Sequence, residues 1–124
     1  MMAEMTATEE ESRRRLQLAV VVPCVTVGPI LQPSVSFSCH HVVRYLTGAA
    51  ATYPNAVAAY ADVRDVARAH VLVYENHGAR GRYLCIGTVI HRAELLRMLK
   101  ELFPQYPVTS KYVLPPSQNI TTLY

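Results

Sequence analysis

The sequence is short of the features that identify nucleic-acid-binding and metal-binding proteins. It contains no tryptophan, and its net charge is only +3. Three arginines stand together at Arg13–Arg15, but no aromatic residues alternate with them, and such a run is typical of a solvated helix end. Three cysteines occur without any C-x-x-C spacing. The composition therefore argues against a nucleic-acid partner and against a zinc or redox site.

Charged residues are missing from one long stretch, and no targeting signal is visible. No Asp, Glu, Lys or Arg occurs in Leu16–Val43. Pro23, Gly28 and Pro33 interrupt this stretch, so it does not predict a membrane span. The first residues, MMAEMTATEEE, lack the basic start and apolar core of a signal peptide. Unpaired cysteines suit a reducing compartment, so we expect a cytoplasmic protein with no membrane partner.

What the sequence does contain is the alternation of helical and extended patterns of a single α/β domain. Hydrophobic residues make up 51% of the chain, enough to build a core. The continuous Val/Leu run within 16–22 predicts a parallel strand buried on both faces. Residues 23–33 are predicted to form a loop. Helices are predicted over residues 3–15, 34–47, 62–75 and 91–103, and further strands over 59–63 and 82–87.

Individual side chains can be assigned in the last two predicted helices. Asp62 is a plausible N-cap, and His70 lies on the apolar side, where we expect a hydrogen-bonded core histidine. His91, Arg92 and Glu94 open the last helix and are expected to be solvated. The predicted apolar face of that helix consists of Leu95, Met98, Leu99, Leu102 and Phe103.

The loop after the first predicted strand is the strongest candidate for a ligand-facing segment. Open α/β sheets bind ligands at the carboxyl ends of their strands, although a structural crossover turn is the alternative. Pro23 and Pro29 restrict this loop, and Gly28 permits unusual backbone angles. The adjacent His40 and His41 point about 100° apart on a helix, which argues against a shared metal ion.

Three stretches resemble one protein family, in order and spacing. They are LAVVVPCVTVGPILQPSVSFSCHHVVRYLTG, AYADVRDVARAHVLVYE and GRYLCIGTVIHRAELLRMLKELFPQYPV. They are similar to the C-terminal part of the extended short-chain dehydrogenases, in particular the cinnamoyl-CoA reductase and dihydroflavonol reductase group. The resemblance implies an incomplete parallel Rossmann-type sheet with a small substrate-binding lobe over residues 1–111, followed by a divergent tail over 112–124.

The resemblance also implies an activity and a set of contact residues. The family transfers a hydride from NADPH to a small aromatic CoA thioester or a related carbonyl, in phenylpropanoid metabolism. Matched by motif, the cofactor-binding positions are Pro23, Cys24, Val25, Thr26 and Ser38. The positions that the resemblance assigns to the substrate pocket are Phe37, His40 and His41.

Two family motifs have no counterpart in this sequence. No glycine-rich G-x-x-G-x-x-G occurs. The family's catalytic Y-x-x-x-K is followed by Ala-Glu, which matches Ala3-Glu4, so the lysine would fall before Met1. We therefore expect no catalytic residue in this chain, doubtful NADP binding and no activity in isolation. The alternative is a non-catalytic module that pairs with a full-length reductase.

Overall fold

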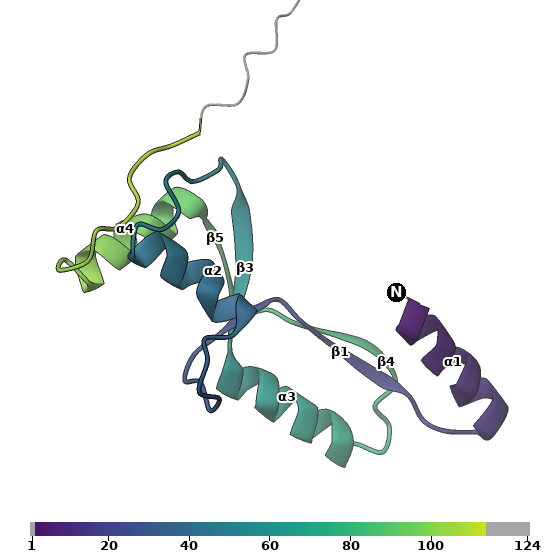
Figure 1. Ribbon diagram of the computed structural model, residues 1–124. Coiled ribbons are helices and arrows are strands. Elements are labelled where there is room, and N and C mark those ends of the chain that lie inside the picture. Colours follow the sequence, from purple (N-terminus) through teal and green to yellow (C-terminus); the bar gives the residue numbers. More distant parts are fainter. Residues whose placement is uncertain (1, 114–124) are drawn as a thin grey trace, which may run out of the picture. The chain divides into compact units, whose positions relative to one another are not determined.

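Two compact units divide the chain in the computed structural model, which describes residues 2–113 (Figure 1). The first unit comprises Met1–Pro29 and Tyr60–Gly87, and the second comprises Ile30–Ala59 and Thr88–Tyr124. The expected boundary after residue 111 stays a prediction, because most of the tail lies outside the described residues. Within residues 2–113, no helix is long and apolar enough to cross a membrane.

The first unit is built on a two-stranded parallel sheet. Its sheet pairs β1 with β4 in a register that runs from Ala19 opposite Gly81 to Pro23 opposite Cys85. α3 packs against both strands (Figure 1). The elements of this sheet and its helices are α1 (Met2–Arg14), β1 (Ala19–Pro23), α3 (Val63–Glu75) and β4 (Gly81–Cys85).

The first predicted strand is shorter and less buried than expected. β1 begins at Ala19 rather than at Leu16, and Val20, Val21 and Val22 are half-buried. The prediction of full burial on both faces is wrong for this chain, because β1 has a single strand neighbour among the residues described. A parallel strand is covered completely only when strands flank it and helices lie on both faces.

A second sheet contains two strands that the sequence pattern did not predict. Its order is β2-β3-β5, and β2 runs parallel to β3 with Val25 opposite Tyr60. The prediction of an uninterrupted loop over residues 23–33 is wrong, because the β-branched Val25, Thr26 and Val27 pair with a neighbouring strand. The strands are β2 (Val25–Val27), β3 (Val57–Asp62) and β5 (Thr88–His91).

The core of the second unit lies between α2 (Phe37–Leu46) and α4 (Arg92–Leu102). Tyr45, Leu96 and Leu99 form this core, and the Tyr45 side chain is 1% exposed. The predicted face of α4 was partly wrong. Leu99 is buried as expected, but Met98 and Leu102 are exposed, and Leu96 takes a core position that was not predicted. The buried residues lie on the side of α4 next to the predicted one, because that side contacts α2.

Capping side chains explain where α2 and α3 begin. Ser36 caps α2 and accepts a hydrogen bond from the Cys39 N–H at 3.2 Å, so the helix begins three residues after the predicted start at residue 34. Asp62 caps α3 as predicted and accepts from the Arg64 N–H at 2.8 Å. His70, expected in the core, is instead exposed. Its Nδ1 contacts the Val66 carbonyl at 2.8 Å, so the ring stays along the helix surface.

The Asp62 cap predicts a loss of α3 helicity in acid. Hydrogen bonds from the Arg64 side chain and backbone lower the pKa of Asp62 from 3.8 to about 2. The ionised carboxylate therefore favours folding above pH 3.8, and this contribution disappears as the pH falls toward 2. Far-ultraviolet circular dichroism should show this change. The matched variant Asp62→Asn keeps a capping oxygen without titrating, so its helicity should respond less to acid; an identical response would contradict the prediction.

Candidate functional site

The uncharged segment Pro23–Thr26 contains the connection between β1 and β2: Pro23 ends β1, Cys24 connects the strands, and Val25 and Thr26 lie in β2. The Cys24 N–H donates to the Cys85 carbonyl at 3.3 Å, which ties the connection to the end of β4. The Thr26 hydroxyl donates to the Cys24 carbonyl at 3.1 Å. Pro23 is exposed, whereas Cys24, Val25 and Thr26 are half-buried. These contacts hold the backbone of the segment in place at the carboxyl end of β1.

This segment fits the nicotinamide end of a dinucleotide site but provides no group that binds the phosphates. A nicotinamide ring needs an uncharged wall with fixed backbone groups and a small hydroxyl, and Pro23–Thr26 offers these. The dinucleotide phosphates need a glycine-rich turn at a helix N-terminus, and the sequence contains no such motif. The fit is therefore limited to the nicotinamide end of the cofactor.

The other predicted contact residues lie on α2, in the second unit. Ser38 is half-buried and His40 is exposed. Phe37 is 92% exposed, which is unusual for so large an apolar side chain. His41 is half-buried and faces a cluster of basic and aromatic side chains. Of the predicted substrate residues, the structure thus places His41 in a polar cluster and leaves Phe37 and His40 on the surface of the helix.

Two arginines converge on His41 and Tyr45. Arg92 Nη1 donates to His41 Nε2 at 2.6 Å, and the Arg92 guanidinium lies 5.4 Å from the centre of the Tyr45 ring. Arg44 Nη2 donates to the Tyr45 hydroxyl at 2.9 Å. The His41 and Tyr45 rings meet edge to face at 5.9 Å. We name these four residues the basic cluster.

The basic cluster was missed by the sequence pattern, and one expectation about it is wrong. Arg92 was expected to be solvated but is 6% exposed, because it turns inward from the start of α4 onto His41. Arg44 could have been found, since it lies three residues after His41 on the same face of α2. No sequence pattern predicts that Arg92 joins the cluster, because Arg92 lies 51 residues from His41 along the chain.

The cluster controls the protonation of His41. Burial lowers the pKa of His41 below 6.5, and the positive charges of Arg92 and Arg44 lower it further. The hydrogen bond agrees with this direction. A guanidinium can only donate, so the Nε2 of His41 accepts, as the neutral imidazole does. His41 is therefore held as a neutral acceptor inside a positively charged cluster.

A proton titration of His41 by NMR should give a midpoint below 6.5 in the folded chain. The same titration in urea should return to the ordinary value, because the arginines and the burial are removed. Since the unfolded chain then binds a proton more readily, the free energy of unfolding should fall as the pH drops through 6.5. Arg44→Gln should move the folded midpoint part of the way upward. Equal midpoints in the folded and the unfolded chain would contradict the prediction that the pKa of His41 is lowered by folding.

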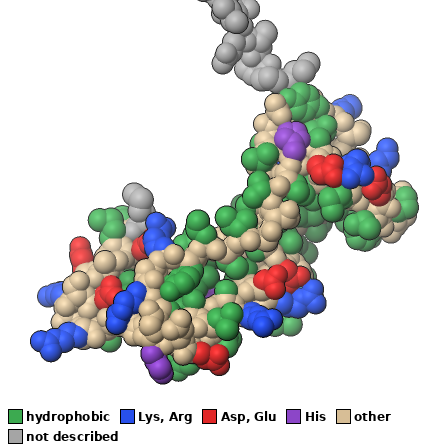
Figure 2. Space-filling model, turned by 180° about the vertical axis from the view of Figure 1, so that it is seen from behind, with side chains coloured by type: hydrophobic (Ala, Val, Ile, Leu, Met, Phe, Trp, Pro, Cys, Tyr) green, Lys and Arg blue, Asp and Glu red, His purple; other side chains and the backbone are tan. Residues whose placement is uncertain are grey.

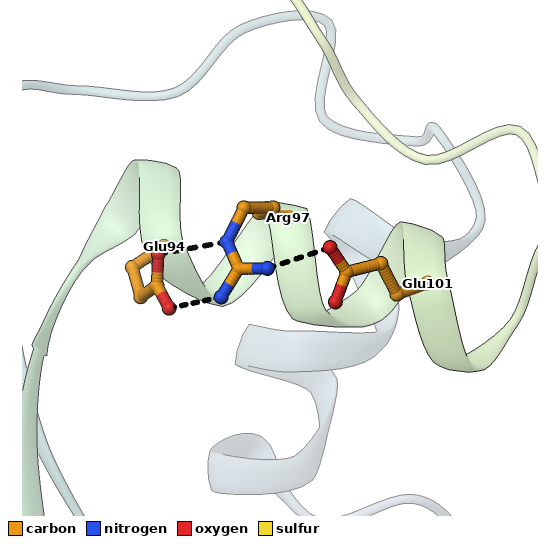
Figure 3. Close-up of polar contacts among 3 residues, drawn as sticks. All are labelled: Glu94, Arg97 and Glu101. Atoms are coloured by element: carbon orange, nitrogen blue, oxygen red, sulfur yellow. Dashed lines mark hydrogen bonds and ion pairs between the residues drawn. The ribbon is translucent and has the colours of Figure 1, made fainter.

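A second charged group, on the outside of α4, is structural rather than part of the site. Arg97 binds Glu94 and Glu101 on either side, each through a contact of 2.6 Å (Figure 3). All three side chains are more than two-fifths exposed. Glu94 is thus solvated as expected. Exposed pairs of this kind contribute little to folding because water and salt screen them, so this network is a feature of the helix surface.

Comparison with known proteins reveals close relatives of the chain, although no family model matches it. Cinnamoyl-CoA reductase 1 of Oryza sativa subsp. japonica is 73% identical over 111 residues, which make up 90% of this chain and 33% of the relative. Cinnamoyl-CoA reductase 1 of Arabidopsis thaliana is 49% identical over 111 residues, covering 90% of this chain and 32% of the relative. The chain is homologous to the cinnamoyl-CoA reductases. It spans about a third of the length of these relatives.

The solved structures agree on the fold. Vestitone reductase from alfalfa (Medicago sativa) superimposes with a TM-score of 0.74 at 22% identity, over 86% of this chain and 34% of that protein. The predicted α/β fold with a small parallel sheet is thereby confirmed. The relatives that the chain matches are themselves named as reductases.

Proposed function

We propose that this chain forms part of an NADPH-dependent reductase that acts on a cinnamoyl-CoA-type thioester or a related carbonyl of phenylpropanoid metabolism. The observation that carries the proposal is the 73% identity to the rice cinnamoyl-CoA reductase over 90% of the chain. At the level of the fold, the match to a plant reductase of known structure supports it.

In this proposal the first unit contributes to the cofactor site. When bound, NADPH would supply the hydride that adds to the substrate carbonyl. Pro23, Cys24, Val25 and Thr26 would border the nicotinamide end, mainly through backbone groups and the Thr26 hydroxyl. The half-buried, uncharged character of Cys24–Thr26 supports this role. Ser38 would approach the cofactor from α2. The family's tyrosine, which donates the proton, and the lysine that lowers the pKa of that tyrosine have no counterpart in this sequence.

The second unit would contribute to the substrate site. Phe37, His40 and His41 lie on α2, and the exposed Phe37 ring offers a flat apolar surface for an aromatic group. The positive charge of Arg44 and Arg92 beside His41 favours an anionic substrate, such as a phosphate-bearing thioester, over a neutral carbonyl compound. This charge is the structural observation that supports a thioester within the proposed substrate class.

The isolated chain would be inactive under this proposal, because it carries neither the phosphate-binding turn nor the tyrosine–lysine pair. The second candidate function follows from the same observation. The chain would then act without catalysis, as a module that pairs with a reductase polypeptide. The incomplete two-stranded sheet of the first unit favours this candidate.

A chimaeric enzyme tests the catalytic proposal. The matched 111 residues of the rice reductase would be replaced by those of this chain. We expect NADPH-dependent consumption of cinnamoyl-CoA within about tenfold of the parent rate, equivalent to about 1.4 kcal/mol in the barrier. A chimaera that folds and binds NADPH but leaves the thioester unchanged would overturn the proposed activity. The unmodified 124-residue chain, assayed alongside, should show no turnover.

A further inference from the structure

The helix α4 begins at an uncommon cap, a histidine side chain. His91 Nδ1 accepts a hydrogen bond from the Ala93 N–H at 3.2 Å, which satisfies one of the free amides of the first turn. Serine, threonine, aspartate and asparagine usually supply this acceptor, and none of them ionises to a cation. His91 was expected to be solvated but is half-buried in this position. The start of α4 therefore depends on the type of side chain that ordinarily changes its charge near neutral pH.

The second ring nitrogen of His91 shows where the ring carries its proton. Nε2 lies 2.8 Å from Asn55 Oδ1, in the segment that precedes β3. A backbone N–H can only donate, so Nδ1 is the unprotonated acceptor, and the proton of the neutral ring then lies on Nε2. Nε2 donates this proton to the Asn55 oxygen. One neutral tautomer of His91 thus makes both hydrogen bonds.

Protonation of the ring removes the capping acceptor. A second proton can bind only to Nδ1, which then faces the Ala93 N–H and can no longer accept from it. The new positive charge also lies at the N-terminus of α4, which is the positive end of the helix dipole. Figure 2 shows histidine side chains at the molecular surface, and the His91 ring is only half-buried, so protons from solution reach it. Acid therefore leaves the first turn of α4 without its cap.

The carboxylates near His91 do not compensate for this charge. Glu94 lies in the first turn of the same helix, but its two oxygens bind Arg97 at 2.6 and 3.0 Å. The neighbouring segment 55–61, which includes most of β3, contains no Asp, Glu, Lys, Arg or His. Among the residues that the structure describes, no carboxylate forms an ion pair with His91.

The residue after the cap connects α4 to the basic cluster. The Arg92 N–H donates to the Ala56 carbonyl at 2.9 Å, and the Arg92 guanidinium reaches His41 on α2. Arg92 and Arg44 are both positive, so the charges that approach from this side oppose a proton on His91. Arg92 is buried because the first turn of α4 directs it inward. When that turn loosens, the backbone that holds Arg92 in the cluster loosens as well.

We propose that His91 is a pH-sensitive cap, whose protonation releases the first turn of α4 and withdraws Arg92 from the basic cluster. All of the residues involved belong to the second unit, so the device is contained in that unit. The inference goes beyond the proposed function, because the device needs neither a cofactor nor a substrate. The basic cluster is fully assembled at neutral pH and opens in acid.

Nitrogen NMR of the 124-residue chain tests the tautomer first. At about pH 7.5 the His91 ring should show a protonated Nε2 and an unprotonated Nδ1, and both nitrogens should be protonated in acid. The protection of the Ala93 amide against hydrogen exchange, corrected for the intrinsic effect of pH, should then fall about fivefold, as for the loss of one cap. A proton on Nδ1 at neutral pH would overturn the inference.

Two variants assign the pH response to His91. Asparagine caps helices well and does not titrate, so His91→Asn should keep the same Ala93 protection at neutral pH and in acid. His77→Asn is the matched control, because it removes an exposed histidine of the first unit and should leave the response of Ala93 unchanged. His41 is present in both variants, so its own titration cancels from the comparison.

The ring signals of Tyr45 report the release of Arg92, whose guanidinium lies 5.4 Å from the centre of that ring. They should shift further in acid in the original chain than in His91→Asn. A pH response of Ala93 that survives in His91→Asn, or that disappears in His77→Asn, would contradict the role of His91. Loss of Ala93 protection with equal Tyr45 shifts in both chains would contradict the withdrawal of Arg92.

Discussion

Replacing Tyr45 with alanine is expected to lower the free energy of unfolding by about 3–5 kcal/mol, as for other large aromatic side chains removed from a core. The Tyr45 ring is 1% exposed and packs with Leu96 and Leu99. The same side chain supports the basic cluster, because Arg44 and Arg92 both contact it. Urea denaturation of the 124-residue chain, followed by near-ultraviolet circular dichroism, measures the loss.

Two further variants serve as comparisons. One removes only the hydroxyl of Tyr45, and the other removes an exposed tyrosine elsewhere in the chain. Tyr45→Phe removes the hydroxyl that accepts from Arg44 Nη2 and should cost about 1 kcal/mol. Tyr74→Ala removes a ring that is 86% exposed and should change the free energy of unfolding by less than about 0.5 kcal/mol. Equal losses for Tyr45→Ala and Tyr74→Ala would show that the core of the second unit lies elsewhere.

Replacing Gly48 with alanine is expected to destabilise the second unit by about 2–4 kcal/mol, the sum of backbone strain and a clash. Gly48 follows α2 with φ of +71°, and a Cβ there would lie 2.7 Å from the Pro107 carbonyl oxygen. That oxygen belongs to backbone, so it cannot turn away as a flexible side chain could. Thermal unfolding of the variant checks the prediction.

Gly81 provides the matched control for this substitution. Its φ of +77° is similar, but a Cβ at Gly81 meets nothing within 4 Å. Gly81→Ala should therefore cost only the conformational strain, about 1–2 kcal/mol. If Gly48→Ala were no more damaging than Gly81→Ala, the close approach of the chain at Pro107 would play no part in stability.

Elements with their own local signals were predictable from the sequence. α3 begins where expected because Asp62 supplies both the capping oxygen and the end of a strand. α2 begins at Phe37, directly after its N-cap Ser36, within the predicted range of 34–47. β2 and β5 were missed because strands of three and four residues have no measurable period and are stabilised by pairing partners distant in sequence. The exposed position of His70 was also beyond reach, since helix periodicity assumes that the apolar side is covered.

Only the part of the candidate site that lies in a recognisable sequence motif could be predicted. The loop from Pro23 to Pro29 could be singled out because prolines bracket an uncharged run at a strand end, whereas Pro23–Thr26 was assigned by the family resemblance alone. The basic cluster could not, because the burial of Arg92 depends on its meeting His41 from another helix. The roles proposed for Pro23–Thr26 and Ser38 at the cofactor, and for Phe37, His40 and His41 at the substrate, all stay predictions.

The central claim is that this chain supplies the nicotinamide wall of a reductase and lacks the turn that binds the cofactor's phosphates. Equilibrium dialysis with NADPH tests it most directly, with the 124-residue chain and the rice chimaera measured side by side. The account predicts micromolar binding by the chimaera and no saturable binding by the chain alone, because phosphate contacts dominate the recognition of dinucleotides. Binding of NADPH by the isolated chain as tight as that of the chimaera would contradict it.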